Sequence, residues 1–249
     1  MQKKSWDKSA DTKKTRSQNE EIRLNKFLSD AGVCSRREAD RMIEAGKVKV
    51  YDHIAVMGEK VTADAKVYVD GKPIEPEEER ILLAVNKPVG IECTCDKKNP
   101  DNIIDFLKYP KRLIYVGRLD KNSSGLLLMT NDGELANRIT KSQEYHEKEY
   151  IVKVNRPITS AFVEQMRSGV EILNRVTRPC IVNQIDSKTF QIILTQGWNR
   201  QIRRMCEALG YKVLELKRIR IMNIGLNRLK EGSYRRITGE ELQELLEQL

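Results

Sequence analysis

Histidine and cysteine are both scarce in this chain of 249 residues. His53 and His146 are the only two histidines, so a histidine-based metal site or a Ser-His-Asp triad has little to draw on. The five cysteines are odd in number and lack the paired spacing of zinc ligands, which favours reduced thiols. Cys93 and Cys95 alternate along a strand-like run, and a metal or redox role is the less favoured interpretation of that pair. We therefore expect no bound metal.

Long apolar runs are also absent. No stretch approaches the roughly 20 residues that a membrane-spanning helix needs, and the N-terminal segment lacks the apolar core of a secretory signal. Residues 1–18 are polar and rich in Lys, Ser and Thr, so we expect them to form a disordered basic tail. These features predict a soluble cytoplasmic protein with no membrane partner.

Positive charge is in excess and is concentrated towards the C-terminal end. The net charge is +9, and a local excess of nearly that size lies between Gln196 and Arg236. A solvated surface normally mixes its signs, so this segment predicts one wall of a groove that binds nucleic-acid phosphates. Only Glu207, Glu215 and Glu231 oppose its basic residues, which are Arg200, Arg203, Arg204, Lys212, Lys217, Arg218, Arg220, Arg228, Lys230, Arg235 and Arg236.

Residues 19–73 have the pattern of a small domain with two helices and a sheet. Apolar residues recur at helical spacing up to Gly32. Ser35 and Glu38 have the spacing of a capping box, which predicts a second helix from Arg36 to about Ala45. Short strands are expected at 48–50, 54–56 and 67–69, and Asp70-Gly71 is a hairpin turn signal.

The second predicted helix has one apolar and one basic face. Ala39, Met42 and Ile43 fall on one side, which is expected to pack. Its basic residues fall on the other side, where they can meet phosphate. The residues of this domain that we expect to bind RNA are Arg23, Lys26, Arg36, Arg37 and Arg41.

A proline-containing, acidic run at 74–80 cannot build a core and is the predicted linker to a larger domain, residues 81–249. Short strands without regular βαβ spacing dominate this domain. We therefore expect an α+β protein whose larger domain surrounds a large mixed, mostly antiparallel sheet. Few helices are expected there: one after Asp132, one over residues 159–168, one from about Asn199 to Leu209 and one over residues 239–249.

The segment GRLDKNSSGLLLMTNDG, residues 117–133, is the most informative part of the larger domain. Residues two apart on a strand share a face, so Arg118 and Asp120 could share a pocket in front of a buried strand over residues 126–129. An ion pair at a sheet edge is an equally good interpretation of that spacing alone. The concentration of positive charge elsewhere in the domain favours a functional acid.

Three further segments could converge on the same pocket. Tyr150 lies in a strand-like run, where an aromatic is usually core, although a base removed from an RNA stack needs an aromatic face. Asn199 can cap a helix that carries three arginines with few balancing acids: Arg200, Arg203 and Arg204. Pro88 and Gly90 enforce a turn that presents Lys87, although an ordinary loop lysine fits that position as well.

These motifs resemble a known family. The phrases NKPVG, GRLDKNSSGLLLMTNDG, EKEYIV and QGWNRQIRRMCEALGY occur in the order found in the RsuA family of ribosomal RNA pseudouridine synthases. They follow a segment, RLNKFLSDAGVCSRREADRMIEAGKVKV, that is similar to the RNA-binding domain first known from small-subunit ribosomal protein S-four. Within the family, YHEKEY and KRIRIMNIG are most similar to the RluF branch, which modifies 23S rRNA of the large subunit.

The resemblance implies a role for each matching residue. Asp120 matches the essential aspartate, which either adds to the uracil ring or abstracts a sugar proton once the glycosidic bond is broken. Arg118 matches an arginine that enters the RNA stack beside the displaced uridine, and Tyr150 matches the tyrosine that stacks on the target base. Arg203 matches the arginine that pairs with the aspartate, and Arg200 and Arg204 flank it as phosphate contacts.

The reaction that the resemblance implies needs no cofactor. Isomerising uridine to pseudouridine is redox-neutral, which fits the absence of a Walker loop and of a dinucleotide fingerprint from the sequence. The alternative is a non-catalytic rRNA-binding or ribosome-assembly factor, in which Asp120 is only a structural partner of an arginine. Small-subunit rRNA and a tRNA as a second substrate stay open, and a monomer is the default.

Overall fold

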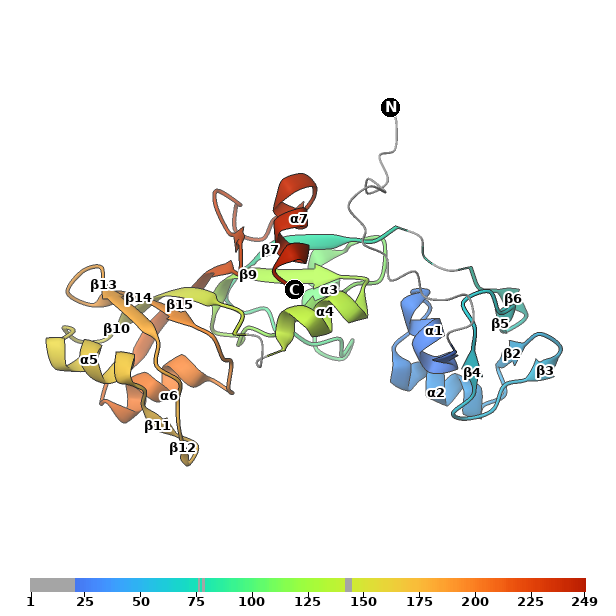
Figure 1. The fold of residues 1–249 in the computed structure, drawn as a ribbon, viewed down its shortest axis with the longest axis horizontal. Helices are drawn as coiled ribbons and strands as arrows, with labels where there is room; N and C mark the ends of the chain where they lie inside the picture. Colours follow the sequence, from blue (N-terminus) through green and yellow to red (C-terminus); the bar gives the residue numbers. More distant parts are fainter. Residues whose placement is uncertain (1–20, 76, 78, 142–144) are drawn as a thin grey trace. The chain divides into compact units, whose positions relative to one another are not determined.

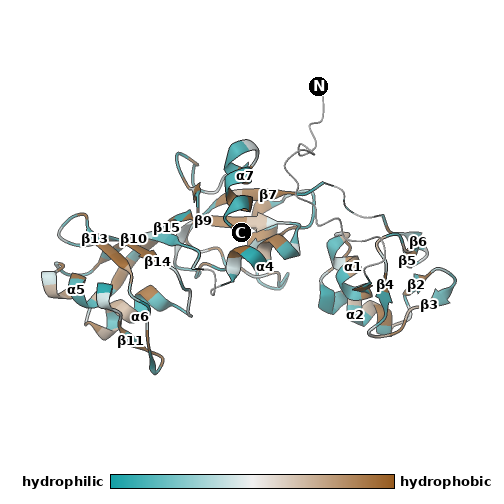
Figure 2. Ribbon diagram, viewed as in Figure 1, coloured by the Kyte–Doolittle hydropathy of each residue, from teal (hydrophilic) through white to brown (hydrophobic). Residues whose placement is uncertain are grey.

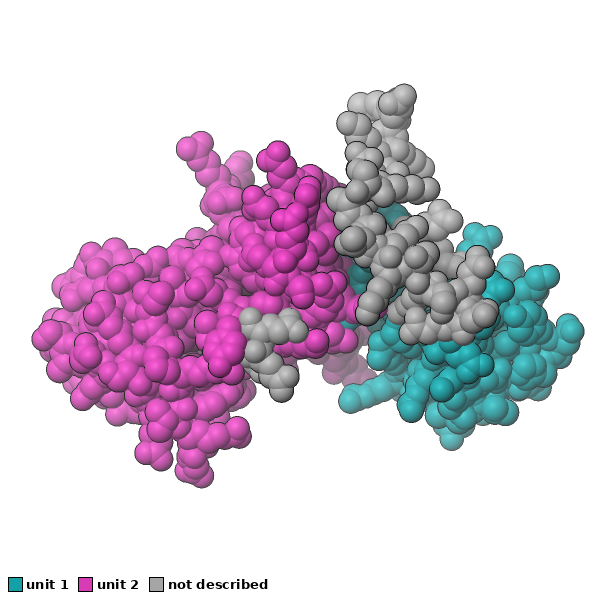
Figure 3. All heavy atoms as spheres, in the orientation of Figure 1, with its two compact units in different colours: residues 1–81, 110–113, 131–133 teal, residues 82–109, 114–130, 134–249 magenta. Residues whose placement is uncertain are grey.

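The computed structural model describes residues 21–75, 77, 79–141 and 145–249 (Figure 1). The predicted basic tail, residues 1–18, lies outside the described residues. Within them, no helix combines the length and the apolar character needed to cross a membrane. The chain divides into two compact units (Figure 3). Unit 1 contains residues 1–81, 110–113 and 131–133, and unit 2 contains residues 82–109, 114–130 and 134–249.

Unit 1 contains the two predicted helices, α1 (Leu24–Asp30) and α2 (Arg36–Glu44). Ser35 accepts a hydrogen bond from the Glu38 amide at 3.2 Å, as the capping box predicts. The Glu38 carboxylate pairs with Arg41 rather than with the Ser35 amide, so only half of the box forms. Leu28, Ala39 and Ile43 are buried in the core of this unit.

A four-stranded sheet completes the small domain, in the order β3-β2-β5-β6. The predicted turn Asp70-Gly71 joins the last two strands, and both residues have positive φ, as a type I′ hairpin turn requires. The short pair β1-β4 was not predicted. The strands of the unit are β1 (Ile22–Arg23), β2 (Val48–Val50), β3 (His53–Ile54), β4 (Lys60–Val61), β5 (Val67–Val69) and β6 (Lys72–Pro73).

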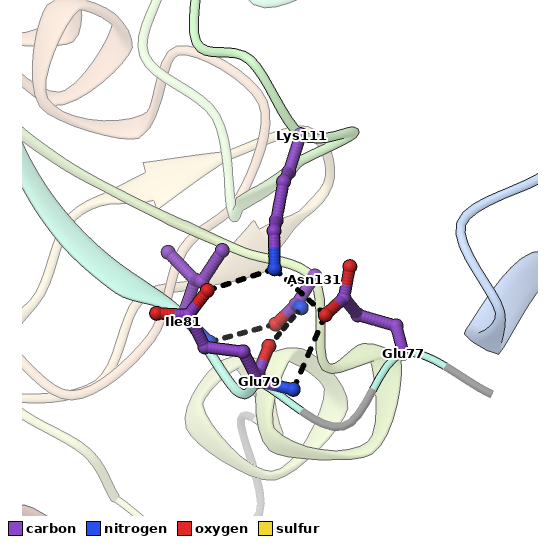
Figure 4. A network of polar contacts seen from close by, with 5 residues as sticks. All are labelled: Glu77, Glu79, Ile81, Lys111 and Asn131. Atoms are coloured by element: carbon purple, nitrogen blue, oxygen red, sulfur yellow. Dashed lines mark hydrogen bonds and ion pairs between the residues drawn. The ribbon is translucent and has the colours of Figure 1, made fainter. Parts of the chain in front are cut away.

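The acidic run predicted as a linker is fixed by polar contacts within unit 1 (Figure 4). Lys111 Nζ lies 2.7 Å from both a Glu77 and a Glu79 carboxylate oxygen. Asn131 accepts a hydrogen bond from the Ile81 amide at 2.8 Å and donates one to the Glu79 carbonyl at 2.7 Å. The segment thus has ordered partners, which its composition alone does not reveal.

Unit 2 contains a nine-stranded, mostly antiparallel sheet, as predicted. Its main path is β13-β14-β10-β15-β9-β7-β17, and only β15 and β9 pair in parallel. All residues of β7 are buried, and Figure 2 shows apolar colour along β7 and β9. The strands are β7 (Leu82–Lys87), β8 (Ile114–Val116), β9 (Ser124–Thr130), β10 (Lys148–Val154), β13 (Ile181–Gln184), β14 (Thr189–Leu194), β15 (Val213–Ile221), β16 (Ile224–Gly225) and β17 (Tyr234–Arg236).

The predicted helices of the larger domain are present. They are α4 (Gly133–Thr140), α5 (Ser160–Ser168), α6 (Gln201–Ala208) and α7 (Gly239–Glu247). A further short helix, α3 (Ile103–Leu107), and the hairpin of β11 (Glu171–Ile172) and β12 (Arg175–Val176) were not predicted. Residues of α5, α6, β10, β14 and β15 share one apolar core, so α5 and α6 cover the same face of the sheet.

Candidate active site

Asp120 lies in a loop between β8 and β9, not on a strand. Residues 118–120 have no strand hydrogen bonding, and Gly117 before them has φ +70°. The prediction that Arg118 and Asp120 share one strand face is therefore wrong. Arg118 is exposed and makes no hydrogen bond or ion pair with the described residues, whereas Asp120 is half-buried. The strand β8 ends at Val116, and Gly117 with positive φ begins the loop that carries both residues.

Hydrogen bonds from several segments fix the Asp120 loop. The Leu119 amide donates to Cys93 Sγ at 3.4 Å, and the Gly90 amide donates to the Lys121 carbonyl at 2.9 Å. The Asp120 carbonyl accepts from the Ser123 amide at 3.0 Å. Burial raises the pKa of Cys93, so this residue supports the loop as a neutral thiol. The backbone around Asp120 is thus positioned before any RNA binds.

Two guanidinium groups flank the Asp120 carboxylate. Its Oδ2 atom lies 3.7 Å from Arg203 Nε and 3.7 Å from Arg200 Nη1. These distances bring opposite charges together but are too long for hydrogen bonds. The Asp120 side chain is 31% exposed. The carboxylate is therefore held in a positive environment and remains accessible to a substrate.

Arg203 joins the Asp120 loop to helix α6. Its side chain is only 12% exposed, and Nη2 donates to the Asn122 carbonyl at 2.7 Å and to Ser123 Oγ at 3.2 Å. Burial lowers the pKa of Arg203, Arg200 lowers it further, and Asp120 raises it. Its Nε is buried without a hydrogen-bond partner among the described residues. The nitrogen of Arg203 that lies 3.7 Å from Asp120 is thus left without a hydrogen bond.

Helix α6 begins differently from the prediction. Arg200, not Asn199, precedes its first turn, and Arg200 has left-handed backbone angles and makes no side-chain cap. The Gln201 side chain accepts from the Trp198 amide at 3.1 Å instead. Arg204 donates to the Asn199 carbonyl at 3.0 Å and to its side-chain oxygen at 3.3 Å. Arg200 thus reaches Asp120, while Arg204 is bound back to its own loop.

Tyr150 lies on the sheet face that α6 covers. It is half-buried and packs against the core that contains Val152, Leu216 and Ile202. In the antiparallel pairing of β10 with β15, Tyr150 is opposite Arg218. Side chains at opposite positions of two strands project to the same face. Tyr150, Arg218 and the α6 arginine that pairs with Asp120 are therefore on one side of the sheet.

Lys87 is neither presented by a turn nor an ordinary loop lysine, so both interpretations of its sequence position are wrong. It ends β7, is 0% exposed, and donates from Nζ to the carbonyls of Pro88 at 2.8 Å and Ile91 at 2.7 Å. Burial lowers its pKa, and both Asp120 and Arg218 act on it electrostatically. Lys87 thus fixes the chain after β7 within range of Asp120, and it is not presented to a ligand.

Sequence reasoning did not single out two more cations near the site. Arg218 is 3% exposed, and burial together with Arg218 lowers the pKa of Lys148 to about 8. Gly125 of β9 pairs with Arg218, has φ +101°, and a Cβ there would collide with the Arg218 backbone oxygen. The sequence signal that could have identified Lys148 is its position two residues before Tyr150 on one strand.

The predicted RNA-binding residues of the small domain have a different setting. Arg23, Arg36 and Arg37 are exposed and make no ion pair with the described residues. Lys26 pairs with Asp30 at 2.7 Å, and Arg41 pairs with Glu38. The three unpaired arginines therefore have guanidinium groups available to phosphate.

The described residues contain no group of three or more His, Cys, Asp or Glu side chains that could hold a metal ion. What the site does offer is one accessible carboxylate, Asp120, with cations and an aromatic ring in the same part of unit 2. A carboxylate can act as a nucleophile or as a base, and cations and a ring can bind a nucleotide. The arrangement therefore suits a reaction on a nucleotide.

Comparisons with known proteins agree with this arrangement. Residues 81–208 match the family described as RNA pseudouridylate synthase, and residues 22–50 match the S4 domain. The dual-specificity RNA pseudouridine synthase RluF of Salmonella typhi is 48% identical over 90% of this chain and 78% of its own length. The ribosomal large subunit pseudouridine synthase B of Bacillus subtilis is 36% identical over 90% of this chain and 95% of its own.

A solved structure agrees in fold. The crystal structure of a pseudouridylate synthase is 30% identical and superposes with a TM-score of 0.67, covering 90% of this chain and 99% of the other. The family match includes the Asp120 loop, β10 with Tyr150, and helix α6 with Arg203. The chain belongs to the RNA pseudouridylate synthase family and is an RNA pseudouridine synthase with an N-terminal S4 domain.

Proposed function

We propose that this enzyme isomerises specific uridines of ribosomal RNA, mainly 23S rRNA of the large subunit, with Asp120 as the reacting carboxylate. The observation that carries the assignment of Asp120 is its position between Arg200 and Arg203, 3.7 Å from each and hydrogen-bonded to neither. A structural ion pair would close to hydrogen-bond distance. A carboxylate with cations beside it and no hydrogen bond to them is suited to act as a nucleophile or base.

The remaining side chains have roles around the displaced uridine. Leaving the RNA helix costs the target a few kcal/mol of unstacking. Stacking of the base on Tyr150 and insertion of the exposed Arg118 into the vacated space offset that cost. Arg200, which is 47% exposed, and Arg204 contact the phosphates on either side of the target.

The small domain selects the region of RNA that is modified. Arg23, Arg36 and Arg37 supply unpaired positive charge on its surface, and Lys26 and Arg41 add to it when RNA competes with their acidic neighbours. The site for chemistry lies in unit 2, so binding and reaction draw on different residues.

The choice of substrate is supported by the sequence phrases and by the relatives. The 48% identical relative is called dual-specificity, and another relative is named for the large ribosomal subunit. We propose a tRNA as the second substrate class. A monomer acting on rRNA in the cytoplasm completes the proposal.

Mapping of pseudouridine tests this function. The purified protein is incubated, without metal or nucleotide, with total rRNA and with tRNA that lack modification. Carbodiimide mapping at single-nucleotide resolution should find a new pseudouridine in 23S rRNA that is absent when Asp120→Asn is used. A new pseudouridine only in small-subunit rRNA or only in tRNA would overturn the proposed substrate.

A further inference from the structure

Arg218 and Arg220 both lie on β15, but all three guanidinium nitrogens of Arg220 are hydrogen-bonded and only one of Arg218 is, counting the described residues alone. Arg220 donates from Nε to Glu149 at 2.7 Å, from Nη2 to Glu147 at 2.9 Å and from Nη1 to the Met222 carbonyl at 2.7 Å. Arg218 is more deeply buried, yet only its Nε is bonded, to the Leu126 carbonyl at 2.7 Å. A buried guanidinium is costly unless its charge and its donors are satisfied.

The terminal nitrogens of Arg218 have no partner among the described residues. Nη2 is buried without a hydrogen bond, and no carboxylate forms an ion pair with this side chain in the described part of the chain. Its electrostatic neighbours include two more cations, Lys87 and Lys148. Lys87 donates to two backbone carbonyls and Lys148 to one, whereas a terminal nitrogen of Arg218 is buried without a partner among the described residues. This unsatisfied donor beside two further cations points to a missing anion.

The position of Arg218 identifies where that anion forms. Arg218 is opposite Tyr150 on the sheet face that α6 covers, and it is next to Gly125 of the strand that follows the Asp120 loop. Gly125 pairs with Lys87 on one side and with Arg218 on the other, so these two cations lie at neighbouring positions of the sheet, next to the end of the Asp120 loop. A uracil that stacks on Tyr150 and contacts Asp120 would have its edge near these cations.

Resting on the function proposed above for Asp120, we propose that the free donors of Arg218 bind the carbonyl oxygens of the reacting uracil and stabilise the negative charge that forms on them. If Asp120 abstracts a sugar proton, the C1′–N1 bond breaks and its electron pair passes to N1, O2 and O4 of the base. If Asp120 adds to C6, the C5=C6 pair moves to O4. Either route produces an anion at the edge of the base.

The charge disappears again when the isomer is complete. The detached ring turns, C5 bonds to C1′, and the proton on C5 leaves as N1 gains one. Asp120 is regenerated because it returns the sugar proton to C2′ on the first route, or leaves C6 as the C5=C6 bond re-forms on the second, so no atom is lost from the nucleotide. Arg218 then faces a neutral base once more. Its hydrogen bonds are strongest only while the base is anionic, which is the condition for accelerating the reaction.

The test compares two target bases, uracil and 5-fluorouracil, whose anions differ in stability. Single-turnover loss of the target nucleoside is measured on RNA with uridine and on RNA with 5-fluorouridine at the target, because fluorouracil is the stronger acid and the more stable anion. Arg218→Gln should slow the uridine reaction by about 10²- to 10³-fold. The defect should shrink at least about tenfold with fluorouridine, since this base needs less stabilisation.

Controls separate this inference from the proposed function. Asp120→Asn should abolish loss of both nucleosides, and full activity of that variant would overturn the function itself. Arg220→Gln, whose guanidinium is already paired, should leave the ratio between the two bases unchanged. An equal defect of Arg218→Gln with both bases, or no defect, would overturn the role of Arg218. If Arg218→Gln does not fold, Arg218→Lys, which keeps the charge, is used instead. The same ratio of its rate defects with uridine and with fluorouridine then decides the role of Arg218.

Discussion

The arginines of the small domain and those around Asp120 are of one residue type in opposite environments. Arg36 and Arg37 are exposed, and Arg41 is 71% exposed. Arg203 is 12% exposed and Arg218 is 3% exposed. Exposed cations gain affinity by releasing counterions from RNA, and this gain falls with salt. Buried cations are screened little and act on one developing charge. Under the proposed function, burial rather than the number of charges determines whether an arginine binds RNA or takes part in the reaction.

Replacing Arg203 should strongly reduce the rate on the reacting side of this comparison. Arg203→Met removes a cation 3.7 Å from Asp120 and two hydrogen bonds to the Asp120 loop. The single-turnover rate on saturating RNA should fall by about 10²- to 10³-fold. Arg204→Met on the same helix should instead raise the RNA concentration needed for half-maximal rate. An equal loss of rate for both variants would contradict the distinction.

Gly125→Ala tests the contact that seats Arg218. A Cβ there would collide with the Arg218 backbone oxygen in a backbone region with φ +101°, so the free energy of unfolding should fall by about 3 kcal/mol. Gly90→Ala is the matched control, because Gly90 has φ +93° but no atom within 4 Å of the position that a Cβ would take. Its cost should be only about 1–2 kcal/mol. Urea unfolding of both variants measures the difference, and equal losses would show that the contact is unimportant.

Because of Lys148, we expect the free energy of unfolding to change with pH in the alkaline range. Its pKa is about 8 in the folded protein against 10.5 when unfolded, so the unfolded state binds more protons between these values. The free energy of unfolding therefore rises with pH through that window, and charged Lys148 costs the folded state up to about 3 kcal/mol below it. Lys148→Met should stabilise the protein by about 1–3 kcal/mol at pH 7. The gain should vanish above pH 10.5 in urea titrations; a gain that does not change with pH would refute this explanation.

The smallest effect is expected from the exposed arginines. Replacing Arg36 and Arg37 together by Gln should weaken RNA binding by about tenfold and reduce the salt slope of log Kd by about 1.5. The rate on saturating RNA should not change. Arg41→Gln should weaken binding only about twofold, because Glu38 already pairs with Arg41. Fluorescence anisotropy at several salt concentrations measures the Kd of both variants. A lower rate on saturating RNA would contradict the assignment of these exposed arginines to binding alone.

Much of the fold could be predicted because local rules and packing agree in it. The Ser35 cap, the Asp70-Gly71 turn and the apolar run of β9 follow from sequence alone. The strand predicted for Arg118 and Asp120 failed because a two-residue spacing does not distinguish a strand from a loop that turns at Gly117. The Asn199 cap failed because Arg200 adopts a left-handed backbone, which composition does not reveal.

The buried cations could not be predicted for a different reason. Lys and Arg are rarely buried, so an exposed position is the correct first expectation for Lys87 and Arg218. Their burial follows from the order of the sheet, in which β15 pairs with β9 from a distant part of the chain. Local sequence contains no signal for that pairing. The candidate acid was predictable, whereas the cations that complete its surroundings required the three-dimensional structure.

Asp120→Asn is the variant that best separates RNA binding from reaction. The change removes the charge between Arg200 and Arg203 but leaves every exposed arginine of the small domain in place. The expectation is that single-turnover formation of pseudouridine falls by about 10⁴-fold or more, while the Kd for rRNA stays within about threefold of the unaltered enzyme. Loss of affinity together with rate, or pseudouridine formed at the normal rate, would contradict it.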